Sequence, residues 1–308
     1  MAEFNYGGQA VIEGVMMRGA SHAAVAVRNP RGDIIIHDEP LTAPIYTSAW
    51  GKLPFIRGLA LLWDALGLGM RSLMWSANVA IEDDTDVSFH GPVAWGTVAV
   101  AATFGIGIFF ILPFLVARVA DNYVPSPFVS HIIEGALRLA LFLAYIIAIG
   151  QLADIKRVFA YHGAEHMTIN AYEAGAELTP PSVARFSLIH PRCGTGFLLI
   201  VMVVSIFVFS FIGRPNLVWS IVARIVLIPV IAGISYEFIR FSAKRYQTNA
   251  LVRWLITPSL ALQRLTTRPP DAGMLEVAIA ALTSVLRAED RLTVAAPQAA
   301  PAAERAAA

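Results

Sequence analysis

Residues 132–150 read IIEGALRLALFLAYIIAIG, and this stretch decides the fold class. It carries no charged residue besides Glu134 and Arg138, and it is nearly as long as the ~20 apolar residues that cross a bilayer. Three further windows share this character, namely Val93–Val119, which Pro113 interrupts, Thr195–Ile212, and Leu217 to about Tyr236. We therefore predict a mainly α-helical, polytopic membrane protein with about four spans.

The connections between these windows and the distribution of basic residues indicate the sidedness. Residues 121–130 join the first two windows and residues 214–216 join the last two, so two helical hairpins are expected. Basic residues gather outside these two loops, as Lys52, Arg57 and Arg71, as Lys156, Arg157, Arg185 and Arg192, and as Arg240, Lys244, Arg245 and Arg253. Because lysine and arginine are retained on the cytoplasmic side, we expect a multi-pass protein of the cytoplasmic (inner) membrane with both termini in the cytosol.

The overall composition supports the membrane class and excludes some functions. Of the 308 residues, 56% are hydrophobic and only 15% are charged, whereas a soluble domain carries about 25% charged residues. The net charge of +1 argues against nucleic-acid binding by bulk electrostatics. No basic start followed by an apolar core is present near the N-terminus, so no cleaved signal peptide is expected. One cysteine, Cys193, cannot form an intrachain disulfide and is compatible with a reducing compartment.

Residues 1–50 predict a small β-rich cytosolic unit. Ala23–Arg28 alternates weakly in hydropathy, and Asp33–His37 is a β-branched run. The turn signal Asn29-Pro30-Arg31-Gly32 lies between them, so a hairpin is expected. The preceding run, residues 7–19, is rich in glycine and would display Glu13 and Arg18. It lacks the order of a phosphate-binding loop, and it is either a tight β turn or a loop that covers a site.

Three further segments complete the expected organisation. In residues 51–90, apolar side chains recur at helical spacing, which predicts an amphipathic helix at the membrane interface or a fifth buried helix. Residues 91–290 would form the transmembrane domain, including a polar cytosolic segment at 151–194 and a short amphipathic helix at Leu275–Leu286. The Ala- and Pro-rich residues 291–308 predict a disordered tail.

The run His162-Gly163-Ala164-Glu165-His166 is the first candidate site. If the second span continues as a helix through Tyr172, the two imidazoles project from one face, one turn apart, and can share a metal ion. The pattern H-x-x-E-H is also the inverted zinc-hydrolase signature, in which the glutamate serves as base. Glu173 falls near the same line of the helix and could add a carboxylate ligand. The alternative is a group of solvated polar residues at the membrane interface.

The run His190-Pro191-Arg192-Cys193-Gly194 is the second candidate, directly before the third window. Histidine and cysteine three residues apart can ligate one metal. Alternatively, the proline and glycine shape the start of a helix, and Cys193 is a small buried residue. Both candidate runs, and Glu237 at the end of the fourth window, would meet at the same cytosolic face of the membrane.

Charged residues within the predicted spans are few. Glu134 and Arg138 are four residues apart and could pair, whereas Arg224 has no evident partner. Charge inside a membrane is costly and often marks a functional site.

Five blocks in order resemble the YqhQ-like bacterial membrane proteins. They are GGQAVIEGVMMR (7–18), YHGAEHMT (161–168), HPRCG (190–194), AGISYE (232–237) and LQRLTT (262–267), and the resemblance extends from about residue 5 to residue 288. That family is known as a domain of unknown function and is described as metal-dependent enzymes. The resemblance implies a polytopic membrane protein with a cytosolic polar site, but it supplies no substrate. Met167 stands where the family's run leads us to expect a lysine, which leaves the candidate ligands untouched.

The leading hypothesis is a metal-dependent membrane enzyme, a hydrolase acting at the cytosolic interface on a lipid-linked or membrane substrate. In it His162, His166 and His190 hold a divalent metal, zinc in the first place, and Cys193 or Glu173 completes the ligand set. Glu165 would be the general base toward a metal-bound water. The other polar candidates for the site are Glu13, Arg18, Arg192 and Glu237.

Two alternatives come from other classes of function. In a transporter or channel, Arg224, Glu134 and the span broken at Pro113 would line a path, and with so few helices a homo-oligomer would be needed. In a non-catalytic assembly factor, a structural metal would hold the cytosolic segments together. In every case the expected partner is membrane lipid and not nucleic acid.

Overall fold

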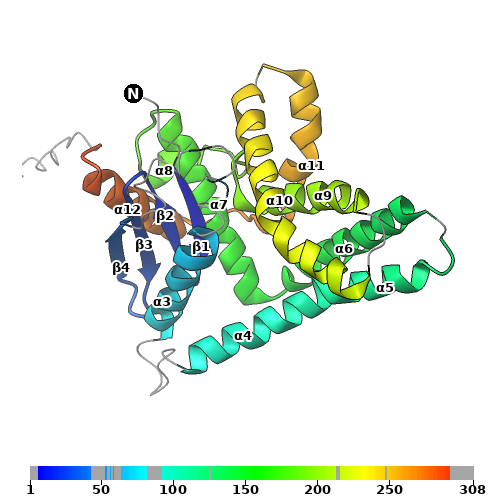
Figure 1. The fold of residues 1–308 in the computed structure, drawn as a ribbon. Helices are drawn as coiled ribbons and strands as arrows, with labels where there is room; N and C mark the ends of the chain where they lie inside the picture. Colours follow the sequence, from blue (N-terminus) through cyan, green and yellow to red (C-terminus); the bar gives the residue numbers. More distant parts are fainter. Residues whose placement is uncertain are drawn as a thin grey trace, which may run out of the picture.

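The computed structural model describes residues 6–42, 64–81, 92–124, 126–212, 216–246 and 248–291, together with Leu53, Ile56 and Gly58. The chain is mainly helical, with a small antiparallel sheet near the N-terminus (Figure 1). The predicted tail lies outside the described residues, except for Arg291. The same holds for most of the segment between residues 43 and 63 and for residues 82–91.

Within the described residues, four strands form one antiparallel sheet in the order β1-β2-β3-β4. They are β1 (Gly7–Val11), β2 (Gly14–Arg18), β3 (His22–Arg28) and β4 (Ile34–Pro40). The predicted hairpin is confirmed as β3 and β4, which turn through Gly32 at φ 93°. The glycine-rich run forms a second hairpin, in which Ile12 and Glu13 connect Val11 to Gly14.

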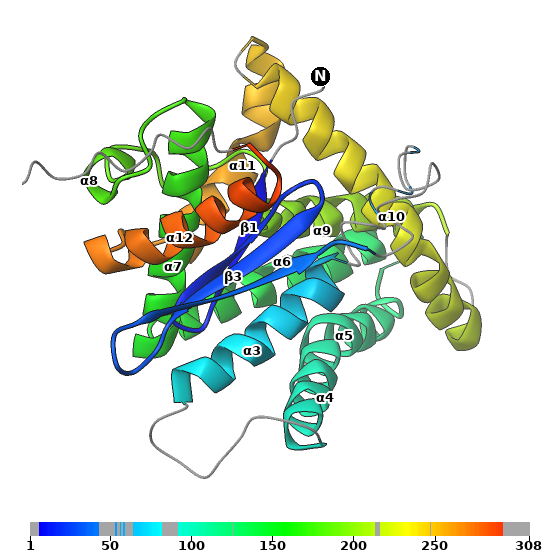
Figure 2. The ribbon, with the colours of Figure 1, turned by 90° about the vertical axis from the view of Figure 1, so that its left-hand side faces the viewer.

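Helices cover both faces of the sheet (Figure 2). On one face, α3 (Gly69–Ile81), which follows the π-helical turn η2 (Asp64–Leu68), packs against strand residues such as Val25. On the other face, α7 (Ala153–Glu173) and α12 (Ala272–Ala288) pack against residues such as Met17. Because both faces of the sheet are buried at β2 and β3, these two strands carry nearly continuous apolar runs, which explains why the alternation in residues 23–28 is weak. The core of the β-rich unit thus combines the N-terminal, middle and C-terminal parts of the chain.

The remaining long helices are apolar and expose much of their apolar surface. In chain order they are α4 (Pro92–Ile106), the π-helical turn η3 (Gly107–Ile111), α5 (Leu112–Ala120), α6 (Pro127–Ile149), α9 (Gly194–Ser210), α10 (Leu217–Arg245) and α11 (Ala250–Thr266). Side chains such as Phe104 and Phe207 are 69% and 58% exposed, which suits contact with lipid and not with water. The short helix α8 (Pro180–Val183) lies in the polar segment.

Three helices of the described part are long and apolar enough to cross a membrane, namely Val93–Val119, Pro127–Ile149 and Val218–Arg245. They correspond to three of the four predicted windows. The remaining window, Thr195–Ile212, is occupied by α9, an apolar helix whose length of 17 residues makes it shorter than the other three. The structure therefore confirms a mainly helical chain with candidate membrane-spanning helices and an N-terminal sheet.

The prediction that the second span continues as one helix through Tyr172 is wrong. Helix α6 ends at Ile149, and Leu152 adopts an extended conformation before α7 begins at Ala153. Helix α7 then turns away from the direction of α6 to lie on the sheet (Figure 1). Since α7 buries its residues in the core of the α/β unit, tertiary packing decides the break, and Gly150 itself keeps a right-handed conformation at φ −64°. The predicted helix at Leu275–Leu286 is confirmed within α12.

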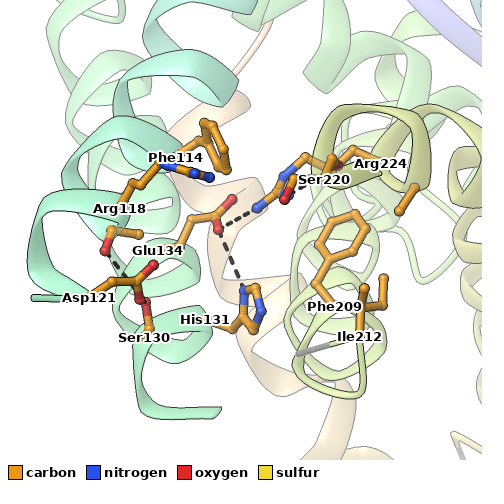
Figure 3. A pocket seen from close by; sticks show the side chains of 12 residues that line it. Phe114, Arg118, Asp121, Ser130, His131, Glu134, Phe209, Ile212, Ser220 and Arg224 are labelled. Carbon is orange, nitrogen blue, oxygen red and sulfur yellow. Dashed lines mark hydrogen bonds and ion pairs between the residues drawn. The ribbon is translucent and has the colours of Figure 1, made fainter. Parts of the chain in front are cut away.

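The charged residues within the apolar helices pair with one another. Arg138 donates to Glu134 at 2.8 Å, which confirms the predicted pair. Arg224 on α10, for which the sequence suggested no partner, donates to the other oxygen of Glu134 at 2.6 Å (Figure 3). Glu134 therefore links α6 to α10 through its ion pair with Arg224, while its ion pair with Arg138 lies within α6.

Candidate metal centre

Helix α7 carries His162 and His166 into the interior of the protein. His166 is fully buried, and the polypeptide after α11 crosses α7 closely at Gly163. A Cβ atom at Gly163 would lie 2.2 Å from the carbonyl oxygen of Arg268, so no larger residue fits without movement. The amide of Arg268 in turn donates to the carbonyl of Phe159 at 2.9 Å. This close crossing brings the end of α11 beside the two histidines.

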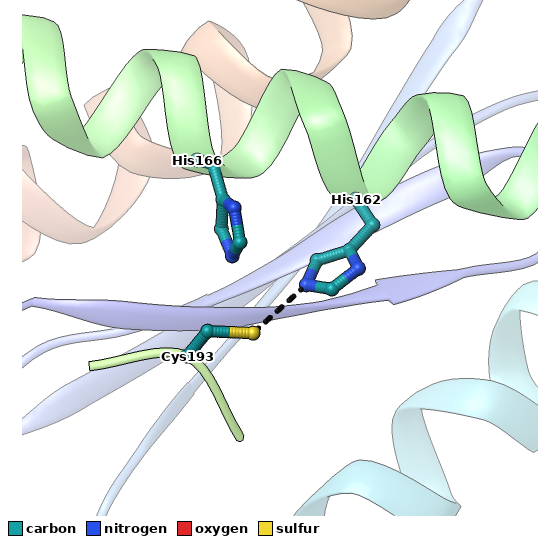
Figure 4. Close-up of side chains that lie close together, drawn as sticks. All are labelled: His162, His166 and Cys193. Atoms are coloured by element: carbon teal, nitrogen blue, oxygen red, sulfur yellow. Dashed lines mark hydrogen bonds between the residues drawn. The ribbon is translucent and has the colours of Figure 1, made fainter. Parts of the chain in front are cut away.

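Three side chains converge on one point (Figure 4). His162 Nε2 lies 3.3 Å from the sulfur of Cys193, which stands at the N-cap of α9. The ligand atoms of His162, His166 and Cys193 all lie within 4.8 Å of one another. Two imidazoles and a thiol at this spacing are a donor set that suits zinc.

Backbone carbonyls orient both imidazoles. His162 Nδ1 lies 2.8 Å from the carbonyl oxygen of Thr266, and His166 Nδ1 lies 2.6 Å from that of Leu188. Because a carbonyl oxygen can only accept, each Nδ1 carries the hydrogen, and each neutral ring keeps its lone pair on Nε2. Histidines that bind metals usually donate their other ring N–H to a carbonyl or carboxylate in this way.

The Nε2 atom of His166 is buried and has no hydrogen-bond partner in the described part of the chain. Leaving a buried polar atom unpaired costs about 1–3 kcal/mol. A cation held between this atom and the neighbouring His162 and Cys193 would supply the missing interaction, and the residues therefore fit a metal ion.

Cys193 lies directly before a helix. It is buried, and its sulfur lies 2.8 Å from the hydroxyl oxygen of Thr195. The N-terminus of α9 begins at the next residue, Gly194, and the partial positive charge of a helix N-terminus favours an anion there. A thiolate, and not the thiol, is the form of cysteine that binds metals.

Glu165 lies at the edge of this cluster. One of its oxygens is 3.8 Å from His162 Nε2, and the carboxylate accepts a hydrogen bond from the backbone N–H of Gly8. Burial raises the pKa of Glu165 to about 7, although His162 and the Gly8 amide act in the opposite direction. A Cβ at Gly8 would lie 2.8 Å from Glu165 Cγ, so the glycine permits the close approach of β1. The glycine-rich run thus forms a tight hairpin that also lies over Glu165.

His190 and Glu173 form an adjoining group. The rings of His166 and His190 are 5.8 Å apart, but His190 Nε2 faces Glu173 at 3.6 Å. Burial lowers the pKa of His190, partly offset by Glu173. Burial alone would raise the pKa of Glu173, but His190 and the ion pair with Arg192 hold it below its usual range. The predicted ligands His190 and Glu173 therefore lie next to the three converging side chains and not among them.

The other predicted polar candidates lie outside the cluster. Glu13 accepts two hydrogen bonds from Arg157, at 2.6 and 2.5 Å, and one from Tyr161 at 3.3 Å, so it fastens the β1–β2 hairpin to α7. Arg18 donates to the carbonyl of Gly19 at the end of β2. Glu237 lies half-buried within α10, and Arg192 belongs to the adjoining group.

Several supporting groups were not found by sequence reasoning. The side chain of Gln263 is buried and holds the backbone of His190 through two hydrogen bonds, of 2.9 and 2.8 Å. The carbonyls of Leu188 and Thr266 orient the rings, and Thr195 contacts the sulfur. Gln263 and Thr266 fall in the block at residues 262–267, whose resemblance to the family was the only available signal.

Comparisons with known proteins place the chain in a family. Residues 53–288 match the family model described as "Protein of unknown function (DUF1385)", and the chain belongs to this family. It is also 33% identical over 296 residues to "Uncharacterized protein YqhQ" of Bacillus subtilis (strain 168), which covers 92% of this chain and 93% of that protein. No solved structure matches. The resemblance seen in the five blocks is thus confirmed, and neither relative brings an activity with it.

Proposed function

We propose that this member of the DUF1385 family is a metal-dependent membrane enzyme, a hydrolase that acts on a lipid-linked or membrane substrate at the cytosolic interface. One observation carries the proposal. His162 and His166 both donate from Nδ1 to backbone carbonyls, which leaves two Nε2 lone pairs beside the sulfur of Cys193. This is how proteins prepare histidines to bind a metal before the metal arrives.

Zinc is the metal that best fits this donor set. Two imidazoles and one thiolate leave a fourth tetrahedral position for water or substrate, as in catalytic zinc sites, whereas structural sites use four protein ligands. When bound, the ion would supply Lewis acidity, which polarises a carbonyl or phosphoryl group and makes water more acidic.

Glu165 is the residue of this chain that can move a proton at the site. Its carboxylate lies 3.8 Å from His162 Nε2, and its pKa of about 7 allows it to accept and return a proton near neutral pH. The Gly8 amide holds the carboxylate in place. Glu165 also stands at the position of the glutamate in the H-x-x-E-H pattern, where it serves as base.

The position of the cluster favours a substrate with a membrane anchor. Cys193 directly precedes the apolar helix α9, and Thr266 is the last residue of α11, which packs against α9. The histidines come from α7, which belongs to the core of the α/β unit. The cluster therefore lies where the apolar helices meet the polar part of the molecule, and a reactive group on a lipid could reach it.

Metal analysis of the purified protein tests the site. We expect close to one zinc per chain in the wild type and a large loss in His166→Ala, because that variant removes the buried Nε2. His37→Ala is the matched control, since His37 is exposed on β4 and its ring stacks on that of Trp75. Negligible metal in the wild type, or equal metal in wild type and His166→Ala, would end the proposal.

A structural metal in an assembly factor is the second candidate, favoured by the burial of His166 and Cys193. Glu165→Gln separates the two functions. If Glu165 is the base, this variant should retain its metal and its fold. It should fail to complement the growth of a strain lacking the protein, and its rate of turnover on lipid extracts of that strain should fall about 10²- to 10⁴-fold. Full complementation by metal-loaded Glu165→Gln would favour the assembly factor.

A further inference from the structure

A second polar site lies at the opposite end of α9 from Cys193. Phe209, near the end of that helix, lines a pocket that also involves α5, α6 and α10 (Figure 3). Sixteen residues separate Phe209 from Cys193, which corresponds to about 24 Å along a helix. The pocket is therefore distinct from the candidate metal centre, and its argument does not depend on the proposed function.

The lining of this pocket is strongly polar for its surroundings. Its described residues are Phe114, Ala117, Arg118, Asp121, Ser130, His131, Glu134, Phe209, Ile212, Ser220, Ala223 and Arg224. Glu134 is buried and receives Arg224 at 2.6 Å from the pocket side and Arg138 at 2.8 Å from behind. His131 Nδ1 lies 3.6 Å from the same carboxylate. Glu134 is thus already paired with two arginines, and it does not neutralise a further positive charge at the pocket.

Positive charge exceeds negative charge at this site. The pocket and the ion pair behind it contain three arginines, Arg118, Arg138 and Arg224, against two carboxylates, Asp121 and Glu134. Arg118 has no carboxylate partner within the described ranges, and Asp121 accepts a hydrogen bond from Ser130 at 2.5 Å. Arg118 is exposed in the last turn of α5, so its charge can attract an anion from outside the chain.

Arg224 is held ready to meet such an anion. Its guanidinium lies over the ring of Phe114, 4.5 Å from the centroid, and 5.2 Å from that of Phe209. Its Nε is buried and has no hydrogen-bond partner among the described residues. Stacking against these two rings restricts the guanidinium plane, while Nη2 donates to Glu134 and Nη1 donates to the carbonyl of Ser220 at 3.2 Å. The N–H groups that remain after these two bonds can donate to a phosphate oxygen.

The depth of the pocket also suits a phosphate group. Glu134 and Arg224 each lie seven residues inside the starts of their helices, Pro127 and Leu217, which is about 10 Å of helix. The polar headgroup region of a bilayer adds about 5–8 Å on each side of the hydrocarbon core. The backbone positions of Glu134 and Arg224 lie deeper than this layer, but a long arginine side chain near a helix end can extend to the interface and meet a lipid phosphate there.

We propose that this pocket binds a phosphate group through Arg118 and Arg224, either from an anionic phospholipid or as free inorganic phosphate. The test uses the full chain in detergent. Native mass spectrometry measures retention of phosphatidylglycerol against phosphatidylcholine, and a thermal shift measures binding of inorganic phosphate. Arg118→Gln is the test variant because Arg118 takes no part in the Glu134 ion pairs. Arg253→Gln, an exposed arginine on α11, is the matched control.

We expect binding to weaken about tenfold in Arg118→Gln, the usual loss for one charged hydrogen bond, and to be unchanged in Arg253→Gln. Loss of phosphatidylglycerol retention identifies the source as a lipid, whereas loss of the phosphate-induced shift alone identifies free phosphate. Equal weakening in both variants would mean non-specific attraction and would overturn the proposal. Absence of both ligands from the wild type would overturn it as well.

Discussion

The two ring nitrogens of each cluster histidine have separate roles. In His162 and His166, Nδ1 satisfies a backbone carbonyl and Nε2 faces the cluster. Sequence spacing predicted that these two rings share a face, and they do lie together, with centroids 4.4 Å apart. The sequence favoured His190 as the third member, with Cys193 or Glu173 completing the set, whereas Cys193 is the side chain that converges with the two histidines; that choice depends on how Gln263 holds the backbone of His190. Gln263 is 73 residues from His190, so the local sequence pattern around either residue could not predict the contact.

At the same scale, Glu165 predicts a pH dependence of stability in the metal-free protein. Its pKa is raised from 4.5 to about 7 by burial. Between these values the folded protein holds a proton that the unfolded chain has lost, so stability is highest below about pH 4.5 and falls as the pH rises through 7. The full loss would be about 3 kcal/mol.

The measurement is the thermal midpoint of chelator-treated protein in detergent from pH 5 to pH 8. Other titrating groups contribute to the same curve, so the difference between wild type and Glu165→Gln isolates this one. Because the amide of the variant does not titrate, the difference curve reports Glu165 alone. We expect it to fall with pH and to level off above neutral pH, where Glu165 is ionised in the folded protein as well. A flat difference, or one that rises with pH, would show that Glu165 ionises freely in the folded protein.

The helices and strands show which sequence signals were sufficient. Membrane helices were predictable because length and apolar composition determine them almost alone. The β3–β4 hairpin was predictable from its turn residues at 29–32. The separation of α6 from α7 was not, since helical propensity continues across Gly150 and the break arises from the packing of α7 on the sheet. Similarly, nothing in residues 1–50 could indicate that α12 completes their core.

The crossing of α7 with the segment after α11 gives a prediction for this element. Gly163→Ala would place a methyl group 2.2 Å from the carbonyl oxygen of Arg268, so the two segments must separate. We expect a loss of about 1–3 kcal/mol in stability, as for overpacking of a core. Metal affinity should weaken too, because the Thr266 carbonyl that orients His162 lies on the displaced segment.

Gly96→Ala on α4 is the matched control for this substitution. A Cβ there meets nothing within 4 Å, and alanine favours a helix over glycine by about 0.5–1 kcal/mol. Its thermal midpoint and zinc content should be unchanged or higher. If Gly163→Ala behaves like Gly96→Ala in both measurements, the close crossing does not position the site.

On the scale of the whole molecule, the mixed origin of the α/β core constrains the topology. The sheet, α7 and α12 pack into one core, so they must lie on the same side of a membrane. Each segment of the chain that connects two of these elements must then cross the membrane an even number of times. Among the described residues between α7 and α12, only α10 meets the length of a span. We therefore expect α9 to enter the membrane with α10 as a hairpin, which restores the four spans predicted from the sequence.

Thiol labelling in intact cells tests this arrangement. The wild type has only Cys193, which is 8% exposed and serves as the unlabelled reference. Asn122→Cys, after α5, and Phe211→Cys, after α9, should react with a membrane-impermeant maleimide. Ala174→Cys, at the end of α7, should react only after permeabilisation. Protection of Phe211→Cys in intact cells, with reaction at Asn122→Cys, would show that α9 does not cross.

X-ray absorption at the zinc edge of the zinc-loaded wild-type protein tests the central claim most directly, because it reports the atoms bound to the metal. We predict one sulfur at about 2.3 Å and two imidazole nitrogens at about 2.0–2.1 Å, with one further light atom. The sulfur shell should disappear in Cys193→Ser. A spectrum from the wild type with only oxygen and nitrogen neighbours would contradict a centre built from His162, His166 and Cys193.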